Sequence, residues 1–401
     1  MSSLTITNVR VFDSATGELR DGPVHVADGV IEAVGSDVVS DGSVPVRPVL
    51  DGRGGTVIPG LIDAHFHAYG IGLKVRAFEV RPLSYLALAA TRRLERALRR
   101  GFTTVRDVAG GDSGLAAAID DGFIASPRYL YTGAALSQTG GHGDLRSADE
   151  SRCVHGGMTV EVVDGVDAVR TAVRDRFRRG AHAIKIMASG GVVSLTDPIR
   201  QPQYSADEIR AATDEAARRG SYVAAHAYSS EAIHHAVENG VRSIEHGNLM
   251  DEAAVEVMAE RGAILVPTLV TYEAMHRRGA EVGMDALARS KNAEVLDSGR
   301  QAVELARAAG VPIGFGTDLM GDLEDEQLAG LRVQAEVEGI ARTLQSATHV
   351  NATLIGRPEL GYVDKGAVAD LVILPGNVLE DPSLLWGESR TVIQAGTVVQ
   401  A

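Results

Sequence analysis

Residues 223–246, VAAHAYSSEAIHHAVENGVRSIEH, contain two short apolar runs that each end in a histidine, with a segment of helical periodicity between them. The same alternation continues in both directions along the middle of the chain. Eight such runs stop at a polar or turn residue, and they end at 62–65, 104–107, 130–133, 184–187, 223–226, 243–246, 264–267 and 313–318. Buried strands that alternate with helices in this number are typical of a (β/α)8 barrel. The sequence therefore predicts an α/β fold built on a (β/α)8 TIM barrel.

Two of the intervening helices have specific boundary signals. The helical pattern of residues 85–100 closes on Gly101, where a left-handed residue is wanted at the end of a helix. Ser205, with Glu208 three residues later, forms a capping box that predicts a second helix, ending near Gly220. A doubly wound open sheet is the alternative fold, but such sheets usually have about five to seven strands and a nucleotide loop. The sequence contains no Walker A motif.

Both ends of the chain have the alternating pattern of short antiparallel strands. The pattern is clear at residues 4–12 and 23–34 and returns at 370–374 and 391–399. Neither end is long enough to bury a core alone. We therefore predict that residues 1–57 and 362–401 pair in one small β-sandwich domain, and that residues 58–361, the barrel, are inserted between them.

Composition and charge restrict the partners of the chain. Its 401 residues include 39 Lys and Arg against 53 Asp and Glu, a net charge of −14. An acidic chain repels phosphate groups, so we expect a small-molecule substrate and no nucleic acid or membrane partner. The start of the chain lacks the basic and apolar segments of a signal peptide, and Cys153 is the single cysteine. These features predict a reduced, soluble, cytoplasmic protein in which any metal is held by histidine and carboxylate.

Ligand-type side chains end five of the predicted strands. His65 and His67 end the first, and residues i and i+2 of an extended segment point the same way, so both imidazoles can reach one ion. Four other strands end at or near Lys185, His226, His246 and Asp318. The carboxyl ends of barrel strands form one face, so these side chains are expected to meet. Zinc favours such nitrogen and oxygen ligands, although manganese and cobalt also bind them.

Lys185 is the unusual member of this set, because it lies between apolar neighbours in a predicted buried strand. A charged lysine buried near cations is strongly destabilised, so its amine must be neutral, paired or modified. One hypothesis is an ion pair with Glu245 or Asp318. The other is a carbamate formed with CO2, which is an anionic oxygen ligand able to bridge two metals.

Longer segments resemble a known family. Residues 59–67, PGLIDAHFH, and the order His-x-His, Lys, His, His, Asp resemble the amidohydrolase superfamily over essentially the whole chain. Further segments are GGHGD at 140–144, KIMASGG at 185–191, AHAY at 225–228 and SIEHG at 243–247. They are similar to the branch of Xaa-Pro dipeptidases (prolidases), basic-residue carboxypeptidases and imidazolonepropionase-like proteins. The lysine is similar to that of the binuclear members, in which it is carboxylated.

The resemblance implies two divalent metal ions, expected to be Zn2+, and often a homo-oligomer. It assigns one metal to His65, His67 and Asp318 and the second to His226 and His246, with carboxylated Lys185 and a hydroxide bridging both. Two cations lower the pKa of a shared water toward about 7.

The resemblance also implies catalytic roles. Asp318 would act as the general base, taking the proton of the hydroxide and passing it to the departing amine. His142 and Tyr228 would contact substrate oxygens and stabilise the oxyanion.

The leading hypothesis is hydrolysis of an amide bond in a small carboxylate-bearing substrate: a dipeptide, an Xaa-Pro-like compound or an N-acyl amino acid. The same metals would serve a carbamate, phenylurea, lactone, cyclic amide or organophosphate, because loops set the substrate. A mononuclear deaminase, which lacks the lysine, and a non-catalytic scaffold are further alternatives.

Several loop residues are weaker candidates for the pocket. Val192 and its neighbours 193–194, after the fourth strand, are expected to line it. Arg152 or His155, and Tyr272 or Arg277, could border it, since an arginine suits a substrate carboxylate. The adjacent His234 and His235 are not expected to be ligands, because neighbouring helical residues point in different directions.

Overall fold

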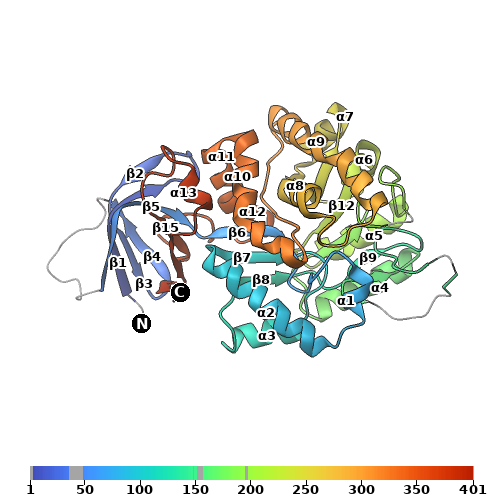
Figure 1. The fold of residues 1–401 in the computed structure, drawn as a ribbon, viewed down its shortest axis with the longest axis horizontal. Coiled ribbons are helices and arrows are strands. Elements are labelled where there is room, and N and C mark those ends of the chain that lie inside the picture. Colours follow the sequence, from blue (N-terminus) through green and yellow to red (C-terminus); the bar gives the residue numbers. More distant parts are fainter. Residues whose placement is uncertain (1–2, 36–47, 148, 151–156, 195–196, 401) are drawn as a thin grey trace.

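The computed structural model describes residues 3–35, 48–147, 149–150, 157–194 and 197–400. Figure 1 shows an elongated molecule with a sheet containing β1 (Ser3–Phe12) and β5 (Val49–Pro59) at one end. The parallel strands and most of the helices lie at the other end (Figure 1).

The sheet at the first end contains strands from both ends of the chain. Its order is β17-β16-β15-β5-β1-β3-β4, and β2 pairs with β1. β15 runs antiparallel to β5, with Leu371 opposite Pro59 and Leu374 opposite Thr56. The two chain ends therefore pair; the sandwich form and the domain limits stay predictions. The remaining strands are β2 (Leu19–Asp21), β3 (Val24–Ala27), β4 (Val30–Val34), β15 (Leu371–Leu374), β16 (Thr391–Gln394) and β17 (Thr397–Val398).

The middle of the chain forms two parallel sheets, so the predicted α/β class is confirmed. Their orders are β6-β7-β8 and β10-β9-β11-β12-β13-β14. Seven of the eight predicted runs contain strands, whereas residues 313–318 make only an isolated bridge from Ile313 to Leu265. The strands are β6 (Leu61–Phe66), β7 (Phe102–Asp107), β8 (Arg128–Tyr131), β9 (Ala135–Ser137), β10 (Val160–Val162), β11 (Ile184–Met187), β12 (Val223–Ser229), β13 (Ser243–Leu249) and β14 (Ile264–Val266).

Backbone hydrogen bonds connect the two parallel sheets on both sides. On one side, His182 N donates to Tyr131 O at 2.7 Å. On the other, the 313–318 segment links β14 to β6, because Gly314 N donates to Leu265 O at 2.8 Å and Ala64 N donates to Phe315 O at 2.9 Å. These bonds hold the two sheets side by side, so the strand ends that carry the candidate ligands lie around one cavity.

Helices follow most of the parallel strands, and both boundary predictions are confirmed. Gly101 has φ +90° directly after α2, and Ser205 and Glu208 form a reciprocal capping box at α5. None of the helices in the described ranges has the length and apolar character needed to span a membrane. The helices are α1 (Val75–Glu79), α2 (Leu83–Arg99), α3 (Ser113–Asp120), α4 (Val166–Arg178), α5 (Ala206–Ala217), α6 (Ser230–Glu238), α7 (Glu252–Arg261), α8 (Leu269–Arg278), α9 (Ala286–Ala308), α10 (Gln327–Glu338), α11 (Ile340–Gln345), α12 (Asn351–Leu354) and α13 (Ser383–Trp386), with a 3-10 helix η2 (Gly321–Glu326) and a short π-helix η3 (Ser346–Val350).

The terminal sheet shares a hydrophobic core with the start of the parallel strands. Phe12, Ile58 and Val372 from the sheet belong to the same buried cluster as Leu94 of α2 and Phe102 of β7. The chain passes from β5 to β6 through a single residue, whose N–H donates to the carbonyl of Asp370 at 2.7 Å. The packed sheet therefore fixes the point from which β6 carries His65 into the molecule.

Glu338, at the end of α10, is a buried carboxyl outside the candidate site. It accepts hydrogen bonds from Gln334 Nε2 at 2.6 Å and from Ser346 Oγ at 3.3 Å. Burial raises the pKa of Glu338 from 4.5 to about 7, against the smaller opposing effect of these two hydrogen bonds. The folded protein therefore keeps a proton that the unfolded chain releases.

We predict that Glu338→Gln stabilises the protein in a pH-dependent way. Because the folded pKa is the higher one, the wild type loses stability as the pH rises from 4.5 to about 7. The gain in unfolding free energy should grow from near zero at about pH 5 to at most about 3 kcal/mol at about pH 8, measured by urea unfolding. Exposed Glu304 on α9 provides the control, Glu304→Gln. An equal effect of Glu338→Gln at both pH values would contradict this account.

Candidate metal and active site

The structure brings the six candidate ligands to one cavity of about 620 Å³, together with His142 and Tyr228. All are buried except Asp318, whose side chain is 17% exposed. The ligand-type residues come from the ends of β6, β11, β12 and β13 and from the 313–318 segment, and they are His65, His67, Lys185, His226, His246 and Asp318.

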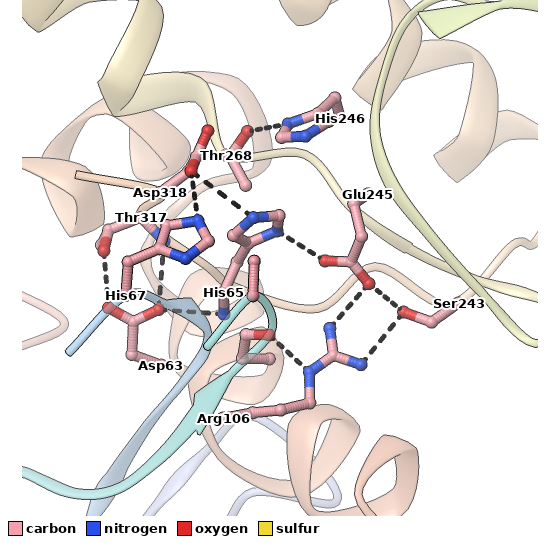
Figure 2. A network of polar contacts seen from close by, with 12 residues as sticks. Asp63, His65, His67, Arg106, Ser243, Glu245, His246, Thr268, Thr317 and Asp318 are labelled. Carbon is pink, nitrogen blue, oxygen red and sulfur yellow. Dashed lines mark hydrogen bonds and ion pairs between the residues drawn. The ribbon is translucent and has the colours of Figure 1, made fainter. Parts of the chain in front are cut away.

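His65, His67 and Asp318 form the first part of the site (Figure 2). His67 Nε2 lies 2.8 Å and His65 Nε2 lies 3.5 Å from Asp318 Oδ1. His65, His246 and Asp318 each offer a ligand atom within 4.8 Å of the others. Burial lowers the pKa of His65 and His246 well below the usual value, so both rings are neutral at pH 7 and keep a lone pair. This donor set fits a divalent cation.

His226 extends the site beyond His246. Their ring centroids lie 4.6 Å apart at an interplanar angle of 70°, and burial lowers the pKa of His226 well below the usual value. His226 Nε2 lies 3.1 Å from the carbonyl oxygen of Gly190. Since a carbonyl only accepts, Nε2 is the donor, and the neutral ring has its lone pair on Nδ1.

Lys185 lies among these ligands without a partner. It is 3% exposed, and burial lowers its pKa to about 8. Its amine makes no hydrogen bond or ion pair with any described residue, so the expected alternative of a pair with Glu245 or Asp318 is not realised there. Each of those carboxylates instead contacts histidine.

Glu245, expected as a possible partner of Lys185, instead forms a buried network with Arg106, which was not predicted (Figure 2). Both side chains are 0% exposed, and Arg106 Nη2 lies 2.7 Å from Glu245 Oε1. The other oxygen, Oε2, lies 2.7 Å from His65 Nδ1. This contact makes Nδ1 the donor and leaves the lone pair of His65 on Nε2, facing Asp318. The signal in the sequence was a charged residue inside each of two buried strands.

Asp63 joins the two segments that carry His65 and Asp318. Its carboxylate accepts from Thr317 Oγ1 at 2.6 Å, from Gln327 Nε2 at 3.0 Å and from the backbone N–H of His65 at 3.2 Å. Burial raises the pKa of Asp63 to about 6, although these hydrogen bonds oppose the rise. The carboxyl is therefore a positioning group behind the ligands.

Backbone strain is concentrated at the same strand ends. His246, Thr268 and Asp318 have φ values of +77°, +47° and +52°, in the left-handed region that non-glycine residues rarely adopt. Such conformations cost on the order of 1–3 kcal/mol each. Thr268 Oγ1 lies 2.8 Å from His246 Nδ1, so one strained residue holds the side chain of another.

His142 packs over His226, at the part of the site formed by His226 and His246. Its ring stacks on that of His226, with the centroids 4.3 Å apart, and its Nδ1 lies 3.4 Å from Asp197 Oδ2. Asp197 also accepts from the N–H of Gly191 at 2.9 Å. A Cβ on Gly191 would lie 2.0 Å from the His142 ring, so only glycine allows this approach.

The ring of Tyr228 stacks on the ring of His246, with the two centroids 5.1 Å apart. Its hydroxyl is 2.9 Å from that of buried Tyr272, which places Tyr272 beside the site.

The other loop candidates lie elsewhere. Arg277 pairs with Glu326 and does not line the cavity. His234 is exposed near Glu238, and His235 bonds the carbonyl of Tyr204, so neither joins the ligands. Arg152 and His155 lie outside the described residues.

Comparisons with known proteins identify the family. A family model described as "Amidohydrolase family" matches residues 56–399. The chain belongs to the amidohydrolase family. The predicted membership is confirmed, and the protein is a hydrolase that acts on carbon–nitrogen bonds.

Several relatives are similar over most of their length. Ochratoxinase of Aspergillus niger is 33% identical over 403 residues, which cover 95% of this chain and 83% of the relative. A solved prolidase complexed with N-methylphosphonate-L-proline is 43% identical, with a TM-score of 0.96 and 100% of both chains covered. A Xaa-Pro dipeptidase with bound methionine is 30% identical, with a TM-score of 0.89 and the same coverage.

We predict that Glu245→Ala destabilises the metal-free protein, because it leaves the buried Arg106 guanidinium without its carboxylate. The expected loss is about 3–5 kcal/mol of unfolding free energy, measured by urea unfolding in a chelator. Glu252→Ala, at an exposed position of α7, should change it by less than about 0.5 kcal/mol. A loss below about 1 kcal/mol for Glu245→Ala would show that the buried pair is not needed.

Proposed function

We propose that this amidohydrolase is a binuclear metal-dependent enzyme that cleaves an amide bond in a small carboxylate-bearing substrate. The substrate class is a dipeptide, an Xaa-Pro-like compound or an N-acyl amino acid. The observation that carries the proposal is buried, unpaired Lys185 among four histidines and an aspartate in one cavity. The similarity to a prolidase and a Xaa-Pro dipeptidase supports the substrate class.

Two groups of side chains would hold the metal ions, expected to be Zn2+. His65 and His67 with Asp318 hold one, and His226 with His246 holds the other. When bound, the cations polarise the scissile carbonyl and lower the pKa of a water. The neutral histidines favour this assignment, because metal ligands must be deprotonated.

Lys185, modified to a carbamate, would supply an oxygen ligand to the metal ions. Its neutral Nζ attacks the carbon of CO2, a nitrogen–carbon bond forms, and the nitrogen releases one proton to solvent. The product is an anionic oxygen ligand in place of a neutral amine. Burial without a direct ion pair to a described carboxylate supports this modification, since a buried ammonium beside two bound cations would be strongly destabilised.

The other side chains act on the substrate. Asp318 takes the proton of the attacking water at a carboxylate oxygen and returns it to the departing amine nitrogen, so the amine leaves uncharged. His142 and Tyr228 donate hydrogen bonds to the carbonyl oxygen as negative charge develops on it. Asp197 beside His142, and Tyr272 beside Tyr228, keep these donors in place.

We also propose that the parallel segments close into one (β/α)8 barrel and that residues 1–57 and 362–401 form a β-sandwich. The backbone bonds from His182 to Tyr131 and from Ala64 to Phe315 support closure. The ligands would then lie at the carboxyl-terminal face of the barrel.

The test is a hydrolysis screen of zinc- and bicarbonate-loaded protein against dipeptides and N-acyl amino acids, with detection of the freed amine. We expect turnover of a coherent subset. Lys185→Ala should lower kcat/KM by about 100-fold or more and reduce the bound zinc below two ions per chain. Exposed Lys365 gives the matched control: Lys365→Ala should retain the wild-type kcat/KM and two zinc ions per chain.

Two outcomes would contradict the proposal in different ways. Silence across the library with two zinc ions bound would reject the amide substrate class. Full activity and two metals in Lys185→Ala would reject the bridging carbamate.

A further inference from the structure

The cavity beside the ligands is larger and more apolar than a small dipeptide requires. Its volume of about 620 Å³ lies within the range of about 300–1,000 Å³ that is typical of pockets for drug-sized ligands. A dipeptide of two small residues would leave much of this space to water. The apolar wall includes Leu73, Met187, Val192, Met275, Met284 and Met320.

Four of those six side chains are methionines. Methionine is flexible and polarisable, so it adapts its surface to aromatic and irregular apolar groups. Met275 and Met284 belong to the same buried cluster as Tyr228 and Tyr272, which joins the apolar wall to the proposed oxyanion donor. An apolar group bound against this wall would therefore lie next to the reacting carbonyl.

The part of the wall that contains Val192 is held in place by a side chain of α9. Residues 192–194, expected from the sequence to line the pocket, do so. The ammonium of Lys291 on α9 donates to one backbone carbonyl inside this segment and to two beside it, those of Ser194, Gly191 and Asp197, at 2.6, 3.1 and 2.8 Å. A preformed wall loses little entropy when a rigid apolar group binds.

The charged residues around the cavity are mostly neutralised by one another. Arg146 makes a double contact with Asp144 at 2.7 and 2.5 Å, and Arg76 pairs with Glu150. Lys74 lines the cavity, and its ammonium makes no hydrogen bond or ion pair with any described residue. The lining therefore offers a broad apolar surface together with the Lys74 ammonium, which a substrate carboxylate can pair with.

We propose that the physiological substrate class is an N-acyl amino acid whose acyl group is a bulky apolar or aromatic unit. The inference rests on the proposed function and narrows it. Water adds to the acyl carbon, the carbon–nitrogen bond breaks, and the oxygen stays on the acyl carboxylate. The nitrogen receives one proton of that water through Asp318, so the free amino acid leaves with an uncharged amine, and the second proton of the water is released from the acyl carboxyl group to solvent.

The test varies the acyl group on one amino acid, chosen as the amine preferred in the hydrolysis screen. With zinc- and bicarbonate-loaded wild type, kcat/KM should rise by about 100-fold from the acetyl to the 2-naphthoyl derivative, because the larger group buries more apolar surface. A kcat/KM for the 2-naphthoyl derivative no higher than that for the acetyl derivative would overturn the inference. Absence of hydrolysis for every acyl amino acid and dipeptide would instead reject the proposed function itself.

A pair of variants on α9 checks that the cavity sets this ratio. Ala288 lines the cavity and is 4% exposed, whereas Ala286 lies one half-turn away and is exposed. Ala288→Leu should lower the naphthoyl-to-acetyl ratio by about 10-fold, and Ala286→Leu should keep it within about two-fold of wild type. An unchanged ratio in Ala288→Leu, in a folded protein, would place the apolar acyl group outside this cavity.

Discussion

Glu245 divides its two carboxylate oxygens between a buried arginine and a buried histidine, and the site depends on that division. Arg106 balances the charge at Oε1, which permits a carboxylate at 0% exposure in the centre of the parallel strands. The second oxygen fixes the ring of His65, so that Nε2 faces Asp318. Without the arginine the carboxylate would be too costly to bury, and without the carboxylate His65 could adopt the wrong tautomer. The buried pair thus acts as a positioning device for His65.

The same strand ends also hold strained backbone. His246, Thr268 and Asp318 adopt left-handed conformations that the surrounding sheets and cores must stabilise. The terminal sheet contributes, because its packed β5 leads directly into β6 and fixes where His65 and His67 emerge. The site therefore draws on the whole molecule: one end of the chain anchors the ligands, and buried side chains behind them set their direction.

The sequence predicted the parallel strands and the grouping of the candidate ligands well, because both follow from where apolar runs stop. It predicted residues 313–318 less well. That segment passes so close to β6 that a Cβ on Gly316 would lie 2.6 Å from the Cβ of His65, and it makes a single bridge in place of a regular ladder. The Glu245–Arg106 pair was missed, because periodicity shows that a charged residue is buried and does not show its partner. The hydrogen bonds of Lys291 could not be predicted either. They join α9 to a loop distant in sequence through backbone carbonyls, and a carbonyl is the same at every residue.

The central claim is that these buried side chains form a site for two metal ions. Anomalous X-ray diffraction at the zinc edge, on crystals of the bicarbonate-treated protein, tests it most directly. The account predicts two anomalous peaks, one beside His65, His67 and Asp318 and one beside His226 and His246, with added density on Lys185 Nζ between them. A single peak, or peaks only at surface residues, would contradict it.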